Sequence, residues 1–144
     1  MKRNAIAVWN GSGAEGTGTL TTPSGALSKQ PYGAKLRFQN EDGKAGTNPE
    51  ELIAAAHAGC FSMALAFRLN AAGATAEEIH TEASLDLVKS DGGFSIPTIH
   101  LTCTAKVPGI DPAKFQELAA DAKANCPVSK VLAGATITLT ATLA

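Results

Sequence analysis

The segment formed by residues 52–69 most restricts what this chain can fold into, because it is apolar over nearly its whole length. It is rich in alanine, and only His57 and Arg68 introduce large polar groups. A membrane span needs about 20 strongly apolar residues, whereas many residues of this segment are small. A helix that is apolar on nearly every face must be enclosed. We therefore expect a long central helix that is buried in protein and does not enter a membrane.

The flanking residues define the ends of this helix. Asn48 suits the N-cap and Pro49 the first helical position, and two glutamates follow at the positive end of the helix dipole. Gly73 suits the C-terminal cap. These signals predict a helix that extends to about residue 72.

The first 40 residues contain short alternating stretches at 4–9 and 17–21, separated by the turn signals Asn10-Gly11 and Ser24-Gly25. They predict a β-meander. Residues 35–39 also alternate, which predicts a strand whose Arg37 side chain leaves the face opposite to its apolar neighbours.

Three clearer alternating stretches lie at 79–87, 98–107 and 137–143, and Asp91-Gly92-Gly93 predicts a hairpin turn between the first two. A second helix is expected after the N-cap Asp111, with Pro127 near its end. A short helical piece over 128–132 can follow. The whole chain, 1–144, is thus predicted to be one α+β domain with antiparallel strands.

Composition excludes some classes of function. The 144 residues include 12 basic and 13 acidic side chains, a net charge of -1, and no basic run longer than Lys2-Arg3. Nucleic acid is therefore not an expected partner. The apolar stretch near the start is too short for a secretory signal, so we expect a cytoplasmic protein.

The three cysteines are Cys60, Cys103 and Cys126. An odd number at wide spacing does not indicate a disulfide scaffold, and in a reducing compartment a disulfide is more often transient and catalytic. By position alone, Cys60 and Cys103 fit core hydrophobes. Cys126, at a helix end before a proline, is the better candidate for an accessible thiol.

Other chemistry has weaker support. His57 and Cys60 lie three residues apart on one helix and could chelate a metal together with Cys126, but no paired cysteine motif supports a metal site. A hydrolase with Cys60 as nucleophile and His57 as base fits the spacing, but no oxyanion arrangement can be read from the sequence. The Gly-rich nucleotide-binding motifs are absent.

Three segments resemble those of the OsmC/Ohr family of organic hydroperoxide reductases: TNPEEL (47–52), AAAHAGCFSMAL (54–65) and NCPVSKVL (125–132). QPYG (30–33) and the arginine of LRF (36–38) favour the OsmC branch. The similarity covers essentially the whole chain in order and spacing. It implies antiparallel sheets around a long buried central helix, in an intertwined homodimer.

The resemblance also implies a two-cysteine peroxidase. Cys60 is the peroxidatic cysteine, which becomes a sulfenic acid, and Cys126 resolves it as a disulfide. A dithiol reductant of the lipoyl type then restores both thiols. Arg37 matches the arginine of the family, and Glu50 matches the glutamate that holds its guanidinium. No cofactor and no metal are implied.

The expected roles impose a geometric condition. Apolar burial raises the pKa of a thiol, and the middle of a helix gains nothing from the helix dipole, so Cys60 needs a nearby cation. Glu50 and Cys60 lie ten residues apart on one helix, roughly 15 Å at ~1.5 Å per residue. If both serve one site, Glu50 must come from a partner chain, which predicts a two-fold dimer.

Two alternatives use the same residues. A peroxide-responsive redox sensor or binding protein would oxidise without turnover, and a structural dimer would carry three inert cysteines. The apolar helix favours an organic hydroperoxide as the substrate, because an apolar pocket would hold an alkyl group.

Overall fold

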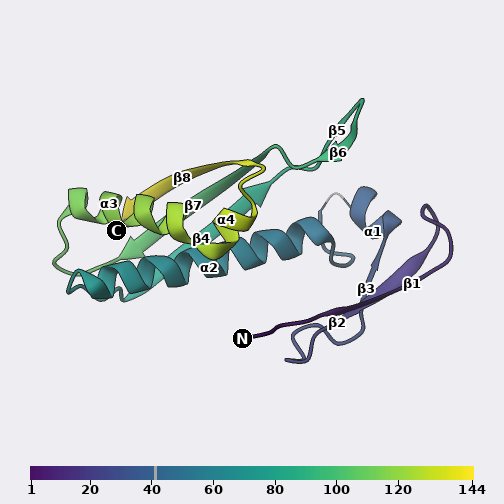
Figure 1. The fold of residues 1–144 in the computed structure, drawn as a ribbon, viewed down its shortest axis with the longest axis horizontal. Helices are drawn as coiled ribbons and strands as arrows, with labels where there is room; N and C mark the ends of the chain where they lie inside the picture. The colour runs from purple at the N-terminus through teal and green to yellow at the C-terminus, as the bar shows by residue number, and fades with distance from the viewer. Residues whose placement is uncertain (41) are drawn as a thin grey trace. The chain divides into compact units, whose positions relative to one another are not determined.

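The computed structural model describes residues 1–40 and 42–144 (Figure 1). The chain divides into two compact units, Met1–Leu52 and Ile53–Ala144, each with its own internal packing. The prediction of a single domain over 1–144 stays a prediction.

The first unit begins with a three-stranded antiparallel sheet. Strands β1 (Ile6–Asn10), β2 (Thr17–Thr21) and β3 (Gln30–Gly33) lie in the order β1-β2-β3. Gly11 and Gly25 occupy the connecting turns with φ of 92° and 79°, a backbone region that glycine enters without strain. The meander predicted from the turn signals is therefore confirmed.

The strand expected over residues 35–39 is wrong. Pairing of β3 with β2 ends at Gly33, and the chain then forms a short helix, α1 (Ala34–Phe38). The amide of Gln39 donates to the carbonyl of Lys35 at 2.9 Å, which closes a helical turn. Because no neighbouring strand extends along these residues, their backbone groups bond locally instead. Arg37 therefore lies on a helix.

The long helix follows the prediction closely. Helix α2 (Pro49–Ala71) begins where Asn48 Oδ1 accepts a hydrogen bond from the Glu51 amide at 2.8 Å. Beyond its last turn, Gly73 adopts φ of 80°, as a C-terminal cap requires. The N-cap and C-cap signals are both confirmed.

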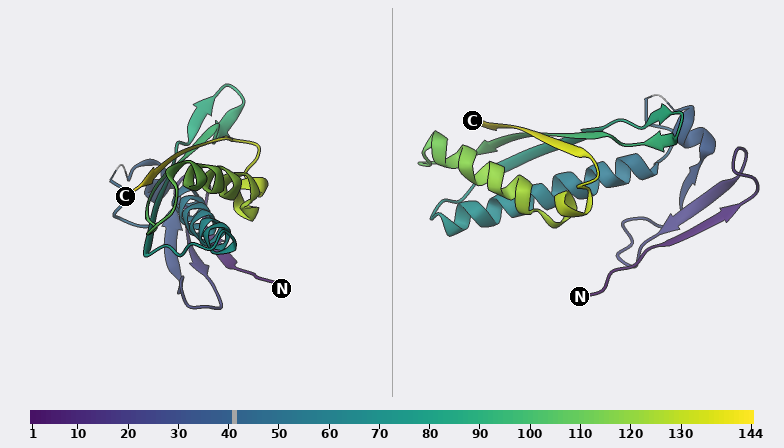
Figure 2. Two further views of the ribbon diagram at one scale, coloured as in Figure 1. Left: turned by 90° about the vertical axis from the view of Figure 1, so that its left-hand side faces the viewer. Right: turned by 45° about the horizontal axis from the view of Figure 1, so that its top comes forward.

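The second unit places helices on one face of a three-stranded sheet (Figures 1 and 2). Strands β4 (Glu78–Leu85), β7 (Thr98–Lys106) and β8 (Thr136–Leu143) lie in the order β4-β7-β8. A separate hairpin, β5 (Val88–Ser90) and β6 (Gly93–Ser95), stands between β4 and β7, with its turn at the predicted Asp-Gly signal.

One pair of strands departs from the antiparallel expectation. β4 and β7 are antiparallel, but β7 and β8 are parallel, with Ile99 opposite Ile137. Parallel neighbours need a crossover connection, and here it contains the helices α3 (Pro112–Asn125) and α4 (Pro127–Val131). The crossover brings these helices back over the sheet.

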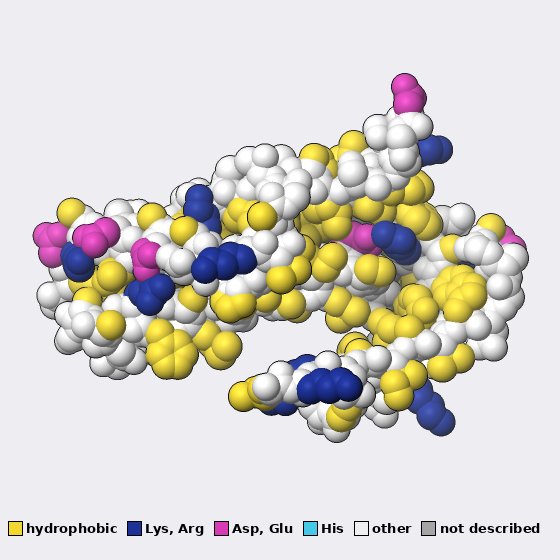
Figure 3. All heavy atoms as spheres, in the orientation of Figure 1, with side chains coloured by type: hydrophobic (Ala, Val, Ile, Leu, Met, Phe, Trp, Pro, Cys, Tyr) yellow, Lys and Arg dark blue, Asp and Glu magenta, His cyan; other side chains and the backbone are white. Residues whose placement is uncertain are grey.

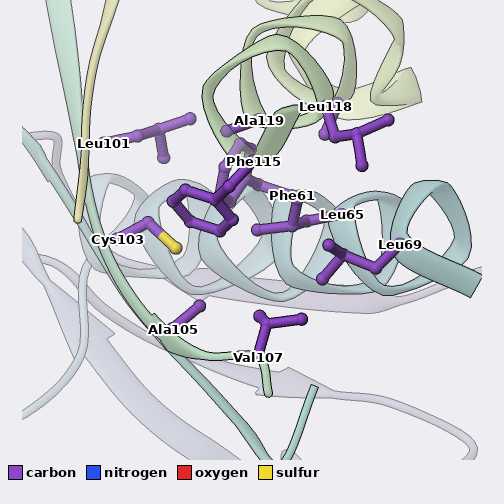
Figure 4. Packing of buried hydrophobic residues seen from close by; sticks show 11 residues of the cluster. Phe61, Leu65, Leu69, Leu101, Cys103, Ala105, Val107, Phe115, Leu118 and Ala119 are labelled. Atoms are coloured by element: carbon purple, nitrogen blue, oxygen red, sulfur yellow. The ribbon is translucent and has the colours of Figure 1, made fainter. Parts of the chain in front are cut away.

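The core of this unit lies between the sheet and the helices α2 and α3 (Figure 4). Phe61, Leu65 and Phe115 are fully buried, and Leu101 and Cys103 meet them from β7. The alternation predicted for β7 is thus confirmed, including the core position of Cys103. This packing fixes the middle of α2 against α3.

Another face of α2 is not covered within one chain. Met63 and Phe67 are 63% and 72% exposed, and apolar side chains stand at the surface in Figure 3. By length and composition alone, α2 could cross a membrane. Its buried apolar residues Phe61, Leu65 and Leu69 pack into the protein core. Within a single chain the helix is therefore not enclosed on this face.

Candidate active site

Two of the cysteines meet in the second unit. Cys60 lies in the middle of α2 and is partly buried, while Cys126 lies between α3 and α4 and is fully buried. Their side chains lie close enough for Cys126 to affect the pKa of Cys60, and both are free thiols.

The prediction of which of these two thiols is the more accessible is wrong. Cys126 was expected to be the accessible one, yet its exposed fraction is 0%. The reason is the turn at Pro127, where Cys126 ends α3 and starts α4 with φ of -56° and ψ of 125°. α4 therefore folds back toward α2 and encloses the sulfur.

The surroundings of Cys60 disfavour its thiolate. Burial raises the pKa of Cys60, and the hydrogen bond and charge of Cys126 raise it further. The backbone amide of Val128 acts in the opposite direction and lowers that pKa. The net effect is upward, so groups of the second unit alone do not activate this sulfur.

A buried hydrogen bond lies beside the thiols. His57 Nε2 and Ser129 Oγ are 2.8 Å apart, and the two residues are 0% and 6% exposed. Burial lowers the pKa of His57, which keeps its ring neutral at pH 7. His57 Nδ1 has no hydrogen-bond partner among the described residues.

The remaining two predicted site residues meet in the first unit. Arg37 Nη2 donates to Glu50 Oε1 at 2.6 Å, and Arg37 Nε donates to Glu50 Oε2 at 3.1 Å. This two-point bond fixes the plane of the guanidinium. Glu51 bonds instead to the hydroxyl of Thr47, which leaves Glu50 available for Arg37.

Arg37 also lines a pocket with aromatic walls. Trp9, Tyr32 and Phe38 surround about 120 Å³ of space within the first unit. The rings of Trp9 and Tyr32 lie 5.4 Å apart, and the Arg37 guanidinium lies 5.2 Å from the centre of the Phe38 ring. The pocket combines apolar walls with one fixed cation.

The four predicted residues thus form two pairs, one in each unit. Sequence reasoning missed the contact of His57 with Ser129, because it considered His57 only as a metal ligand or a base. A signal was present in the spacing, since His57 precedes Cys60 by three residues and Ser129 follows Cys126 by three. No group of three or more possible metal ligands occurs in the part of the chain that the structure describes.

Residues 41–141 match the family model described as OsmC-like protein. The peroxiredoxin OsmC of Escherichia coli K12 is 52% identical over 132 residues, which span 92% of this chain and 90% of that protein. The chain belongs to the OsmC-like family. Another family relative, the organic hydroperoxide resistance protein OhrB of Bacillus subtilis, is 34% identical over 81% of this chain and 82% of its own length.

Solved structures of the family have the same fold. The crystal structure of Bacillus subtilis OhrB is 30% identical and matches with a TM-score of 0.68, covering 98% of each chain. An OsmC-like protein from Mycoplasma pneumoniae matches with a TM-score of 0.77 at 18% identity, over 99% of this chain and 97% of its own. The α+β fold with a long central helix is therefore that of OsmC-like proteins.

The contact between the thiols predicts that the pKa of Cys60 changes when the Cys126 thiol is removed. Cys126→Ala should lower the pKa of Cys60, because it removes a hydrogen bond and a charge that both raise it. The check is the pH dependence of Cys60 alkylation by iodoacetamide, followed by mass spectrometry of the peptide that carries Cys60. Cys103→Ala, which removes a core thiol, is the matched control. An unchanged or higher midpoint in Cys126→Ala would contradict the assigned contact.

Proposed function

We propose that this OsmC-like chain is a thiol-dependent peroxidase that reduces organic hydroperoxides to alcohols in the cytoplasm. The observation that carries the proposal is the interacting pair of free thiols, Cys60 and Cys126, which lie far apart in the sequence. The names of the relatives, a peroxiredoxin and organic hydroperoxide resistance proteins, support the same chemistry.

The proposed reaction has three steps. The Cys60 thiolate attacks the terminal peroxide oxygen, so that an S–O bond forms, the O–O bond breaks, and the leaving alkoxide takes a proton to become an alcohol. Cys126 then attacks the sulfenic sulfur, and the S–S bond forms with loss of water. A dithiol of the lipoyl class reduces the disulfide by thiol exchange and becomes a cyclic disulfide itself.

The proposed activator of Cys60 is Arg37 from a partner subunit. α2 is continuous from Pro49 to Ala71, so Glu50 and Cys60 of one chain are separated by ten residues of helix, roughly 15 Å. Glu50 holds Arg37 at two points and therefore keeps the cation with it. An antiparallel α2 of a second chain would bring this cation to the sulfur and favour the thiolate.

The uncovered face of α2 fits that second chain. Met63 and Phe67 stand exposed on it, and Gly59 leaves room for close approach of another backbone. Apolar residues so exposed are typical of an interface between subunits. A homodimer would bury this face and complete two identical sites.

The pocket beside Arg37 indicates the class of peroxide. Its walls are the aromatic rings of Trp9, Tyr32 and Phe38, which favour an alkyl or aryl group over water. An organic hydroperoxide would place its apolar group there and its peroxide oxygens toward the guanidinium. Hydrogen peroxide has no apolar group that could pack against these rings.

Removal of the peroxidatic sulfur tests the proposed function. Cys60→Ser should abolish consumption of cumene hydroperoxide with dihydrolipoamide, because the hydroxyl of serine is a far weaker nucleophile than a thiolate. Cys103→Ser should keep turnover, since Cys103 lies in the core. Turnover in Cys60→Ser would refute the proposal. A wild-type protein that oxidises once without steady-state turnover would instead be a redox sensor.

Removal of the cation should slow the first step. Arg37→Ala should raise the pKa of Cys60 and reduce its reaction with peroxide at pH 7 by roughly tenfold, with partial recovery at higher pH, where the thiolate forms again. The measurement is stopped-flow oxidation at several pH values. Lys35→Ala is the matched control, because Lys35 is on the same short helix but pairs with the exposed Glu15 at 2.7 Å. Equal rates for Arg37→Ala and wild type would exclude this role.

A charge on the uncovered face should separate the subunits. Phe67→Glu places a carboxylate where Phe67 is 72% exposed in the single chain, and burial of that charge in a dimer would be costly. We expect a monomer by light scattering, with peroxidase activity reduced at least tenfold. Ala120→Glu, on the exposed face of α3, should remain dimeric. A dimeric, fully active Phe67→Glu would argue against the proposed interface.

A further inference from the structure

The short helix α4 buries few side chains against the rest of its unit. It has five residues, of which only Ser129 is buried, and Val131 is 83% exposed. An amphipathic helix of ordinary length is held by an apolar stripe, but α4 is too short to present one. Its position therefore depends on polar contacts.

The main polar contact of α4 is the bond between Ser129 Oγ and His57 Nε2 at 2.8 Å. Both residues are buried, so the bond does not compete with water and is costly to leave unmade. His57 Nδ1 has no partner among the described residues. An unpaired acceptor is tolerated better than an unpaired buried N–H, so the ring proton belongs on Nε2, which donates to Ser129.

The bond between His57 and Ser129 joins the same two segments of the chain as the contact between the thiols. His57 is one helical turn before Cys60 on α2, and Ser129 is one turn after Cys126, the N-cap of α4. The same two segments are therefore joined twice, once through sulfur and once through imidazole and hydroxyl. The bond between imidazole and hydroxyl does not involve the sulfurs, so oxidation of the thiols leaves it in place.

We propose that His57 and Ser129 are positioning residues for the resolving step: their hydrogen bond holds α4 so that Cys126 stays within reach of the oxidised Cys60. This inference rests on the proposed function. The first step involves the Cys60 sulfur and the peroxide, so it does not need the bond. The second step forms the S–S bond and releases water, and it requires Cys126 at bonding distance. If that step is slow, a second peroxide oxidises the sulfenic acid to sulfinic acid.

The first test separates the two steps in a single turnover. Ser129→Ala should form the Cys60 sulfenic acid at the wild-type rate, while disulfide formation slows by about tenfold or more. Dimedone labelling should increase, and sulfinic acid should accumulate at high peroxide. Disulfide formation at the wild-type rate in Ser129→Ala would overturn the proposal.

Matched variants distinguish positioning from loss of stability. Ser62→Ala removes a hydroxyl of α2 that donates to Thr81 Oγ1 of β4 at 2.8 Å, and it should leave the resolving step unchanged. His57→Gln places an N–H near the former Nε2 and should keep most of the resolving rate. His57→Asn, whose shorter side chain does not reach Ser129, should lose it. Equal resolving rates in the Gln and Asn variants would count against the bond.

A second measurement does not depend on peroxidase activity. In a glutathione redox buffer, the equilibrium between the dithiol and the Cys60–Cys126 disulfide reports the effective concentration of one thiol at the other. Ser129→Ala should lower this concentration by about tenfold, and Ser62→Ala should not. If the wild type fails to turn over peroxide but Ser129→Ala still weakens the disulfide, the proposed function is refuted and the positioning role stands. An unchanged equilibrium in Ser129→Ala would overturn the positioning role.

Discussion

The ionisation of one sulfur in an apolar setting is the constraint on which the rest of the site depends. Cys60 lies at the centre of a helix that packs into the core, and both burial and Cys126 raise its pKa. The Val128 amide offsets this only in part. A bidentate pair of Arg37 with Glu50 provides a cation of fixed orientation within the same chain. The proposed dimer joins the sulfur to that cation without moving either from its own unit.

Local signals in the sequence were sufficient for most of the fold. Asn48 and Gly73 marked the ends of α2, and strict alternation marked β7, because capping and pleating are properties of a few adjacent residues. Two features needed information from elsewhere in the chain. The helix at residues 34–38 forms because no strand extends alongside it, and the parallel pairing of β7 with β8 follows from the crossover through α3.

The four candidate residues form two contacting pairs, and their roles in a site stay a prediction. Arg37 and Glu50 do meet, and so do Cys60 and Cys126, which the resemblance to the family had suggested. The burial of Cys126 could not be read from its neighbours, since it results from α4 folding back onto α2 after Pro127. The partner of His57 was hidden for the same reason, because Ser129 is 72 residues away in sequence.

The sparse attachment of α4 also bears on how a reductant can enter. Because Ser129 is the one buried residue of α4, we expect this segment to open, with loss of the His57–Ser129 bond, at a lower free energy than the one that unfolds the whole unit. Such opening would expose the sulfur of Cys126 transiently while Phe61, Leu65 and Phe115 keep the core closed. Amide hydrogen exchange over 128–131 would then be much faster than in the middle of α2, and entry of the proposed dithiol would depend on this local opening rather than on a permanent channel.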